Sequence, residues 1–172
     1  MSSYYFEIKS NEGSKVASIL FAKVVSILHA VTKVDGQSPI GINFPFMQEH
    51  KNENVTSFGE TMRVFGTKGD LLVFLRNASL SALLEEPDLT VSKIQEVPDD
   101  AAFVQTLRDR TVERRKKLKI KVERYFPYMK LKSLSNKKKF SLFIKTKTVQ
   151  EPTPGYFSTY GLSKDGSTTP YF

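Results

Sequence analysis

Residues 15–32 read KVASILFAKVVSILHAVT, and this stretch decides how the chain begins to fold. Its large aliphatic side chains recur every three or four residues, which is the spacing of one face of an α-helix. Ser14 is a suitable N-terminal cap, and Asp35-Gly36 is expected to end the element. Strand-like segments flank it, YYFEIK at residues 4–9 and IGINFPF at residues 40–46. The chain is therefore predicted to begin with a strand, a helix and a strand.

The elements predicted further along complete a β-α-β-β-α-β order. Residues 61–65 and 89–97 are strand-like, a short helix covers residues 70–77, and residues 80–84 extend or follow that helix. This order is the ferredoxin-like arrangement. We therefore predict an α+β protein whose ferredoxin-like domain occupies residues 1–97.

A second domain is predicted at residues 98–172, after a hinge at Pro98–Asp100. Residues 103–125 are expected to form one basic helix. Its apolar stripe is narrow, so the helix would dock against one neighbour and present the rest of its surface to something negative. A β-hairpin is predicted from residues 130–133 and 140–146, and a tail rich in Gly, Ser, Thr and Tyr follows it.

The net charge of +8 is concentrated in the second half of the chain. Residues 101–147 hold sixteen Lys and Arg against three acidic residues, whereas residues 1–100 hold nine basic and thirteen acidic ones. Such a field attracts a polyanion, and phosphate contacts would dominate its affinity. We expect RNA rather than DNA, because a helix dense in Arg can lie along the groove of an RNA hairpin. A solvated charged helix without a nucleic-acid partner is the alternative.

Few residues are available for chemistry. The chain has no cysteine and only two histidines, so thiolate, zinc and iron sites are not expected. Its Asp and Glu are dispersed, which argues against metal-ion catalysis, and no motif points to a cofactor. His29 remains, because an imidazole can take a proton from a ribose 2′-hydroxyl near neutral pH. Taken alone, a helix histidine without a task is the commoner case, and His50 is interpreted as a surface residue.

The expected location is the cytoplasm, with no membrane partner. Residues 16–31 are apolar, but Lys23 and His29 interrupt them, so we interpret the segment as an amphipathic core helix. No small-residue cleavage site follows it, which argues against an export signal.

Four short segments carry motifs that occur together in one known family. They are LFAK at residues 20–23 leading to His29, IGINFP at residues 40–45, LKSLS and FSLFI within residues 131–144, and YGLSKDG at residues 160–166 followed by a terminal PYF. In this combination and order, the chain resembles the type I-F CRISPR repeat endoribonucleases, the crRNA-processing family of the Ypest subtype. The segments span almost the whole chain, so the joint match is far more specific than any one of them.

The resemblance implies a ferredoxin-like N-terminal half and an arginine-rich helix in the major groove of an RNA hairpin. It implies metal-independent cleavage by 2′-hydroxyl attack on the adjacent phosphate, which leaves a 2′,3′-cyclic phosphate and a 5′-hydroxyl. The implied partners are the CRISPR repeat hairpin, retained as crRNA product, and other subunits of a type I-F surveillance complex.

The resemblance also implies residue roles. His29 would hold or accept the proton of the 2′-hydroxyl, Ser133 would hydrogen-bond the ribose, and Tyr160 would orient the imidazole. Phe140 would stack on a base at the foot of the stem, and Ser135 would assist Ser133. Contact with RNA is assigned as a whole to the polar residues of the basic segment and the hairpin turn. These are Gln105, Arg108, Arg110, Arg114, Arg115, Lys116, Lys117, Lys119, Lys121, Lys137, Lys138 and Lys139.

The sequence departs from the family where a base pair would be read. The family uses an Arg and a Gln two residues apart before the helix; Gln105 matches, but Phe103 stands where the Arg is expected. The helix is also richer in Lys, which is a poorer bidentate reader than Arg. Two alternatives therefore stay open, a non-catalytic hairpin-binding subunit of a CRISPR effector complex and a ribosome- or duplex-associated basic protein.

Overall fold

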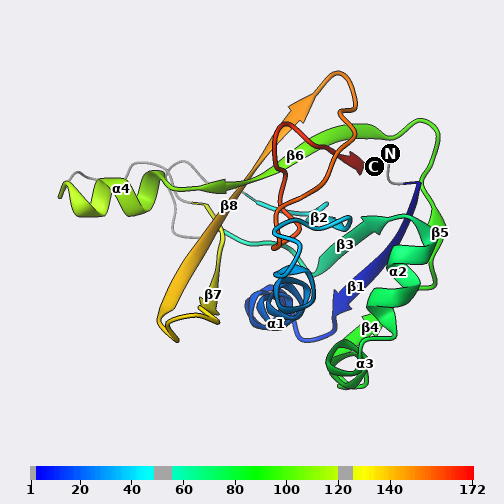
Figure 1. Cartoon of the computed structure of the whole chain (residues 1–172), viewed down its shortest axis with the longest axis horizontal. Coiled ribbons are helices and arrows are strands. Elements are labelled where there is room, and N and C mark those ends of the chain that lie inside the picture. Colours follow the sequence, from blue (N-terminus) through cyan, green and yellow to red (C-terminus); the bar gives the residue numbers. More distant parts are fainter. Residues whose placement is uncertain (1–2, 49–55, 120–125) are drawn as a thin grey trace.

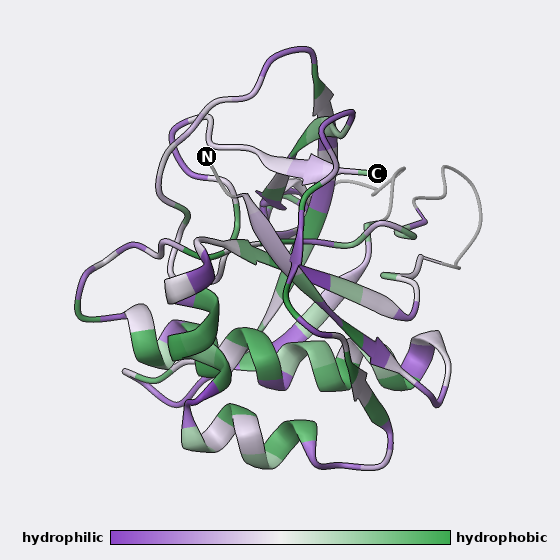
Figure 2. Cartoon of the chain, turned by 90° about the vertical axis from the view of Figure 1, so that its right-hand side faces the viewer, coloured by the Kyte–Doolittle hydropathy of each residue, from purple (hydrophilic) through white to green (hydrophobic). Residues whose placement is uncertain are grey.

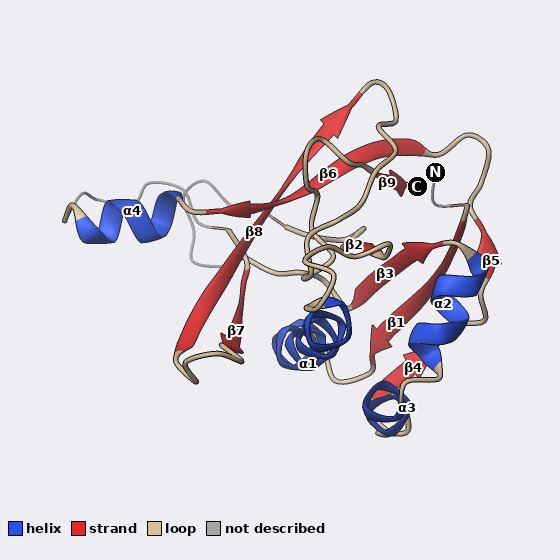
Figure 3. Ribbon diagram, in the orientation of Figure 1, coloured by secondary structure: helices blue, strands red, loops and turns tan. Residues whose placement is uncertain are grey.

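The computed structural model describes residues 3–48, 56–119 and 126–172, apart from the side chains of Val112 and Lys116 (Figure 1). In chain order, its elements are β1 (Tyr4–Ser10), α1 (Ser14–Thr32), β2 (Gly41–Asn43), β3 (Thr61–Gly66), α2 (Lys68–Leu75), α3 (Ala78–Leu84), β4 (Leu89–Val91), β5 (Gln95–Glu96), β6 (Ala102–Asp109), α4 (Thr111–Lys117), β7 (Tyr128–Lys132), β8 (Lys139–Val149) and β9 (Thr169–Tyr171). The strands form two antiparallel sheets (Figure 3).

The first sheet has the strand order β2-β3-β1-β4, with the short β5 also paired to β1. All its pairings are antiparallel, and Phe6 lies opposite Val64 in the central pair. Helices α1 and α2 pack on this sheet, and α3 contacts both helices. The α+β class and the ferredoxin-like order predicted from the sequence are therefore confirmed. The predicted strand at residues 89–97 is divided into β4 and β5.

Helix α1 is the central core helix of the chain. Its apolar face, which includes Leu20, Phe21 and Leu28, is buried against β1 and β7. By length and composition alone α1 could cross a membrane, but in this fold its apolar face serves the core. The prediction that Ser14 caps the helix is wrong, because the cap position is Gly13 and no side chain there bonds to the helix.

The second sheet has the order β7-β8-β6-β9 and corrects the largest error of the sequence interpretation. Residues 103–109 are not helical; they form most of β6, paired with β8 from Phe103 opposite Val149 to Asp109 opposite Phe143. Val104 and Thr106 alternate into the interior, as β-branched residues favour in strands. The helix predicted at residues 103–125 is reduced to α4, and residues 120–125 lie outside the described part.

The predicted hairpin is confirmed as β7 and β8, with β8 longer than expected. The amide of Ser133 donates to the carbonyl of Lys138 at 2.9 Å, which closes the turn between the strands. Lys137 occupies the left-handed region there, with φ of 59°. The turn therefore presents several lysines at the end of the hairpin.

The apolar core continues across residue 97, where the two predicted domains meet. Buried residues of the second sheet and the tail, such as Met129, Ile144 and Leu162, join one cluster with the α1 residues. Figure 2 shows hydrophobic residues along the helices that cover the first sheet. The domain boundary and hinge stay a prediction, while the shared core fixes the site residues of the second half against α1.

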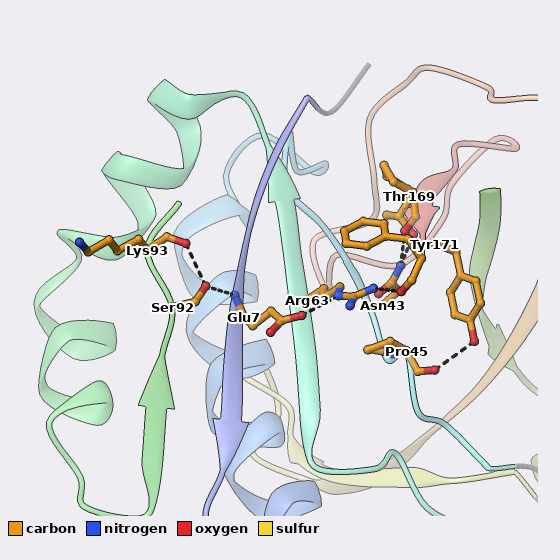
Figure 4. Close-up of polar contacts among 10 residues, drawn as sticks. Glu7, Asn43, Pro45, Arg63, Ser92, Lys93, Thr169 and Tyr171 are labelled. Atoms are coloured by element: carbon orange, nitrogen blue, oxygen red, sulfur yellow. Dashed lines mark hydrogen bonds and ion pairs between the residues drawn. The ribbon is translucent and has the colours of Figure 1, made fainter. Parts of the chain in front are cut away.

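The C-terminal tail is anchored to the first sheet by side-chain hydrogen bonds (Figure 4). The buried amide of Asn43 donates to the Thr169 hydroxyl at 3.1 Å and to the Pro170 carbonyl at 2.6 Å. The Tyr171 hydroxyl donates to the Pro45 carbonyl at 3.0 Å. Each bond joins a residue at the end of β2 or just after it to β9, so the end of the chain is fixed to the edge of the sheet.

Arg63 provides a second anchor for the tail. Its guanidinium lies 4.0 Å from the centre of the Phe172 ring, donates to the Phe172 carbonyl and pairs with Glu7 at 2.8 Å. The side chain of Arg63 is only 9% exposed, so its charge depends on these partners. Together with the Asn43 contacts, this anchor attaches the C-terminal end of the tail to the first sheet.

Candidate active site

His29 lies in the last turns of α1, with its ring half-buried. Its Nδ1 is 2.8 Å from the Thr159 hydroxyl oxygen. Thr159 is itself held in place, because the Thr32 hydroxyl lies 3.2 Å from the Thr159 carbonyl oxygen and donates to it. No hydrogen bond is made by Nε2 to any described residue.

Tyr160 contacts His29 through its ring. The two ring centres are 4.3 Å apart and the planes differ by 13°, so the rings stack. The structure thus places Tyr160 against the imidazole, as expected, but the hydrogen bond to the imidazole comes from its neighbour Thr159. Sequence reasoning missed Thr159, because this residue lies outside the YGLSKDG motif and carries no signature of its own.

Gly161 fixes the position of the two preceding residues. Its φ is 75°, and a Cβ atom there would lie 3.0 Å from Leu28 Cδ2 and 3.1 Å from Ile42 Cγ2. The Ile42 amide also donates to the Gly161 carbonyl at 2.9 Å. A larger residue would be strained and crowded at this point, so the glycine lets the tail approach α1 closely enough for Thr159 and Tyr160 to reach His29.

Phe140 and Arg108 continue the site beyond Tyr160. The Phe140 ring meets the Tyr160 ring edge-on, with centres 6.3 Å apart and planes at 72°. The Arg108 guanidinium carbon lies 5.7 Å from the centre of the Phe140 ring. Arg108 was expected on the basic helix, but it extends from β6. A row of functional groups therefore runs from α1 through the tail and β8 to β6.

Ser133 and Ser135 are brought together at the start of the hairpin turn, with their hydroxyl oxygens 3.0 Å apart. Ser133 follows directly after β7, the strand that packs against α1. Within the described residues, no hydrogen bond joins Ser133 to His29 or Tyr160. Of the predicted trio of His29, Ser133 and Tyr160, the structure therefore joins His29 and Tyr160 by direct contact. The role of Ser133 stays a prediction.

The electrostatic setting of the site favours a neutral imidazole. Burial lowers the pKa of His29 below its ordinary value, and the positive charge of Lys33 lowers it further. Burial raises the pKa of Tyr160, and the charge of Arg108 partly opposes this rise. At neutral pH the site therefore holds an uncharged imidazole and an uncharged phenol beside one guanidinium.

The predicted RNA-binding residues lie mainly on two projections, α4 at the far left of Figure 1 and the β7–β8 turn at its lower left. The exposed members are Arg110, Arg114, Lys117, Lys119, Lys137, Lys138 and Lys139, whereas Arg115 is half-buried. The side chain of Lys116 is not described, and Lys121 lies outside the described residues. Gln105 is on β6, where its amide donates to the Gly166 carbonyl at 2.9 Å and holds the tail.

Two other features complete the description of the surface. A broad groove between α1, α3 and β7, lined by Ile19, Ala22 and Leu131 among others, includes none of these site residues. Within the described parts of the chain, no three His, Asp or Glu residues are grouped so that they could hold a metal ion.

A comparison with family models agrees with this arrangement. The model described as CRISPR-associated protein (Cas_Csy4) matches residues 5–125 and 112–172, which together include both sheets and every site residue. The chain belongs to this family. The family is one of CRISPR repeat endoribonucleases, so the chain is a CRISPR RNA-binding and RNA-processing protein, and the duplex- or ribosome-associated alternative is set aside.

Solved structures add little to this assignment. A structure described as "An RAMP protein binding different RNA substrates" aligns over 100% of both chains at 8% identity, with a TM-score of 0.40. The family membership rests on the sequence match and not on this likeness.

Proposed function

We propose that the chain is a metal-independent endoribonuclease that binds CRISPR repeat stem-loops and cuts pre-crRNA at the foot of the stem. The observation that carries the proposal is the fixed imidazole of His29, hydrogen-bonded at Nδ1 by Thr159 and stacked on Tyr160. A ring held at one nitrogen and on one face has its other nitrogen aimed in a constant direction. Such positioning is what general-base catalysis requires.

In the proposed reaction, Nε2 of His29 takes the proton from the 2′-hydroxyl of the nucleotide before the scissile phosphate. The 2′-oxygen then bonds to phosphorus, and the bond from phosphorus to the 5′-oxygen breaks. The products are a 2′,3′-cyclic phosphate and a 5′-hydroxyl, whose proton comes from solvent. A single positioned base of this kind contributes about 10²–10⁴ in rate.

The other candidate residues fit this reaction by their places. Phe140 presents a half-buried ring next to Tyr160, where it would stack on the last base of the stem. Ser133 and Ser135 form a hydroxyl pair that would hold the ribose. The exposed cations of α4 and of the β7–β8 turn would contact the phosphates of the hairpin. We further propose that the product stays bound in the cytoplasm within a type I-F surveillance complex.

The experiment that tests this function is cleavage of the repeat hairpin in EDTA by wild type, His29→Ala and His50→Ala. His50 is the other histidine of the chain and serves as the matched control. We expect wild type and His50→Ala to cut once and to leave a cyclic phosphate, identified by phosphatase and kinase treatment. His29→Ala should bind the hairpin in a gel shift without cutting it.

Three results would contradict the proposed chemistry. Cleavage that requires a divalent metal would contradict the metal-independent reaction. Cleavage by His29→Ala at the wild-type rate would show that His29 is not the base. A wild-type protein that binds the hairpin without cutting would identify the chain as a non-catalytic hairpin-binding subunit.

A further inference from the structure

Arg108 lies on the face of the second sheet that carries Phe140. In the β6–β8 pair it stands opposite Ile144, and Phe140 follows on the same face, because side chains alternate along a strand. The guanidinium is next to the Phe140 ring, and Phe140 contacts Tyr160, which stacks on His29. Two aromatic rings, Phe140 and Tyr160, therefore separate the cation from the proposed base, and the cation lies beside the ring expected to receive the foot of the stem.

The charge of Arg108 is only weakly engaged within the protein. Among the described residues it makes one ion pair, from Nη2 to Glu113 at 3.1 Å, and both side chains are about one-third exposed (30% and 38%). Exposed pairs of this kind contribute little to stability, so a phosphate can compete for the guanidinium. The Nε atom of Arg108 is buried and has no hydrogen-bond partner among the described residues.

The field of this cation already reaches the site. The positive charge of Arg108 opposes the rise that burial causes in the pKa of Tyr160. The Tyr160 hydroxyl therefore lies within electrostatic reach of the guanidinium. Arg108 differs in this respect from the exposed cations of α4, such as Arg114.

We propose that Arg108 is a catalytic residue of the cleavage reaction. Its guanidinium leaves Glu113, binds the scissile phosphate and stabilises the negative charge that develops on this phosphate in the transition state. This inference rests on the proposed function. When the 2′-oxygen attacks and the 5′-oxygen has not yet left, extra charge collects on the two non-bridging oxygens. A guanidinium can donate two parallel N–H bonds to such oxygens. Loss of one preorganised donor of this type typically lowers the rate about 10²–10³-fold.

The test separates catalysis from binding by measuring single-turnover cleavage at saturating protein alongside the Kd for an uncleavable 2′-deoxy hairpin. The variants are Arg108→Gln, Arg108→Lys and a matched control, Lys147→Gln, which removes one exposed cation from the same sheet. We expect Arg108→Gln to lower the cleavage rate constant about 10²–10³-fold and to change the Kd far less. Arg108→Lys should recover part of the rate, and Lys147→Gln should cut like wild type.

Glu113→Gln distinguishes a catalytic role from a merely structural one. It removes the ion pair but keeps Arg108, so we expect it to cut at least as fast as wild type. A Glu113→Gln variant as slow as Arg108→Gln would overturn the inference, because the ion pair itself would then be the important feature. Replacing one non-bridging oxygen of the scissile phosphate by sulfur should slow wild type for one stereoisomer and affect Arg108→Gln less.

The inference fails independently of the proposed function. If wild type cuts in EDTA and Arg108→Gln cuts equally fast at saturation, only the role of Arg108 is wrong. If wild type does not cut, the proposed function fails first.

Discussion

Two regions of the chain are expected to meet the same RNA, and they are built in opposite ways. The His29 site, comprising His29, Thr159, Tyr160, Phe140 and Arg108, is half-buried, and each member contacts another member. The basic projections, α4 and the β7–β8 turn, carry exposed cations. The site therefore depends on a few interlocked contacts, whereas the projections depend on the number of charges.

This difference indicates which substitutions should change the cleavage rate and which should change the affinity for RNA. Groups that act as a unit lose most of their effect when one member is removed. Charges that contact a polyanion act nearly independently, and each contributes a modest part of the affinity. Substitutions in the His29 site should therefore change the cleavage rate at constant affinity, and substitutions on the basic projections should do the reverse.

After the substitutions of His29 and Arg108 described above, the largest expected effect tests the stacked ring. Tyr160→Leu removes the surface on which the His29 imidazole rests, and the misplaced base should lower the single-turnover rate constant about 10²-fold. Tyr160→Phe keeps the stacked ring and loses only the hydroxyl, so we expect it to be much closer to wild type. If Tyr160→Phe is as slow as Tyr160→Leu, the hydroxyl rather than the stacking is what the reaction needs.

Thr159→Val sharpens the comparison further, because it removes one hydrogen bond and little volume. The contact at Nδ1 fits the tautomer in which Nδ1–H donates to the Thr159 hydroxyl and Nε2 keeps its lone pair. Without that partner the ring has two tautomers and a freer orientation, so cleavage should slow about tenfold. Thr159→Ser keeps the hydroxyl and is the control. Equal rates for Thr159→Val and wild type would show that stacking alone positions the base.

The first half of the fold was predictable because its periodicities are unambiguous. The aliphatic spacing of residues 15–32 and the alternating strands around them determine one helix and its sheet. In the second half of the chain, the density of positive charge made a strand look like part of a basic helix. Arg108 and Arg110 adjoin the dense cations of α4, so residues 103–109 were merged into one helix. Only pairing with β8 and β9, which joins residues far apart in sequence, makes this segment a strand.

The site was predictable in part for a related reason. Motifs identified His29, Tyr160 and Phe140, and the fold brings these three together. Thr159 has no signature of its own, because any small polar residue there would read as part of a loop. The location of Arg108 could not be found from sequence either, since its neighbours in space depend on strand register rather than on local pattern.

The basic projections are tested by Arg114→Gln, which removes an exposed cation of α4. If Arg114 contacts one phosphate, the hairpin Kd at 0.1 M salt should rise about sixfold, and the slope of log K against log salt should fall by about one. The rate constant at saturating protein should change little. Arg76→Gln, an exposed arginine after α2, is the control and should leave the Kd unchanged. If Arg114→Gln lowers the cleavage rate constant at saturating protein, the basic projections contribute to catalysis as well as to binding, and the proposed difference between the two regions is wrong.

The smallest expected effect concerns the pH dependence of the His29 site. Burial and the charge of Lys33 both disfavour the imidazolium, so they lower the pKa of His29 and keep the base neutral at pH 7. Cleavage should therefore decline only as the pH falls through this lowered pKa. Lys33→Gln removes the repulsion and raises the pKa, which moves the acidic limb of the pH–rate profile to higher pH while the rate at alkaline pH stays the same. Lys9→Gln, an exposed lysine on β1, is the matched control, and a Lys33→Gln profile that superimposes on it would show that Lys33 does not tune the base.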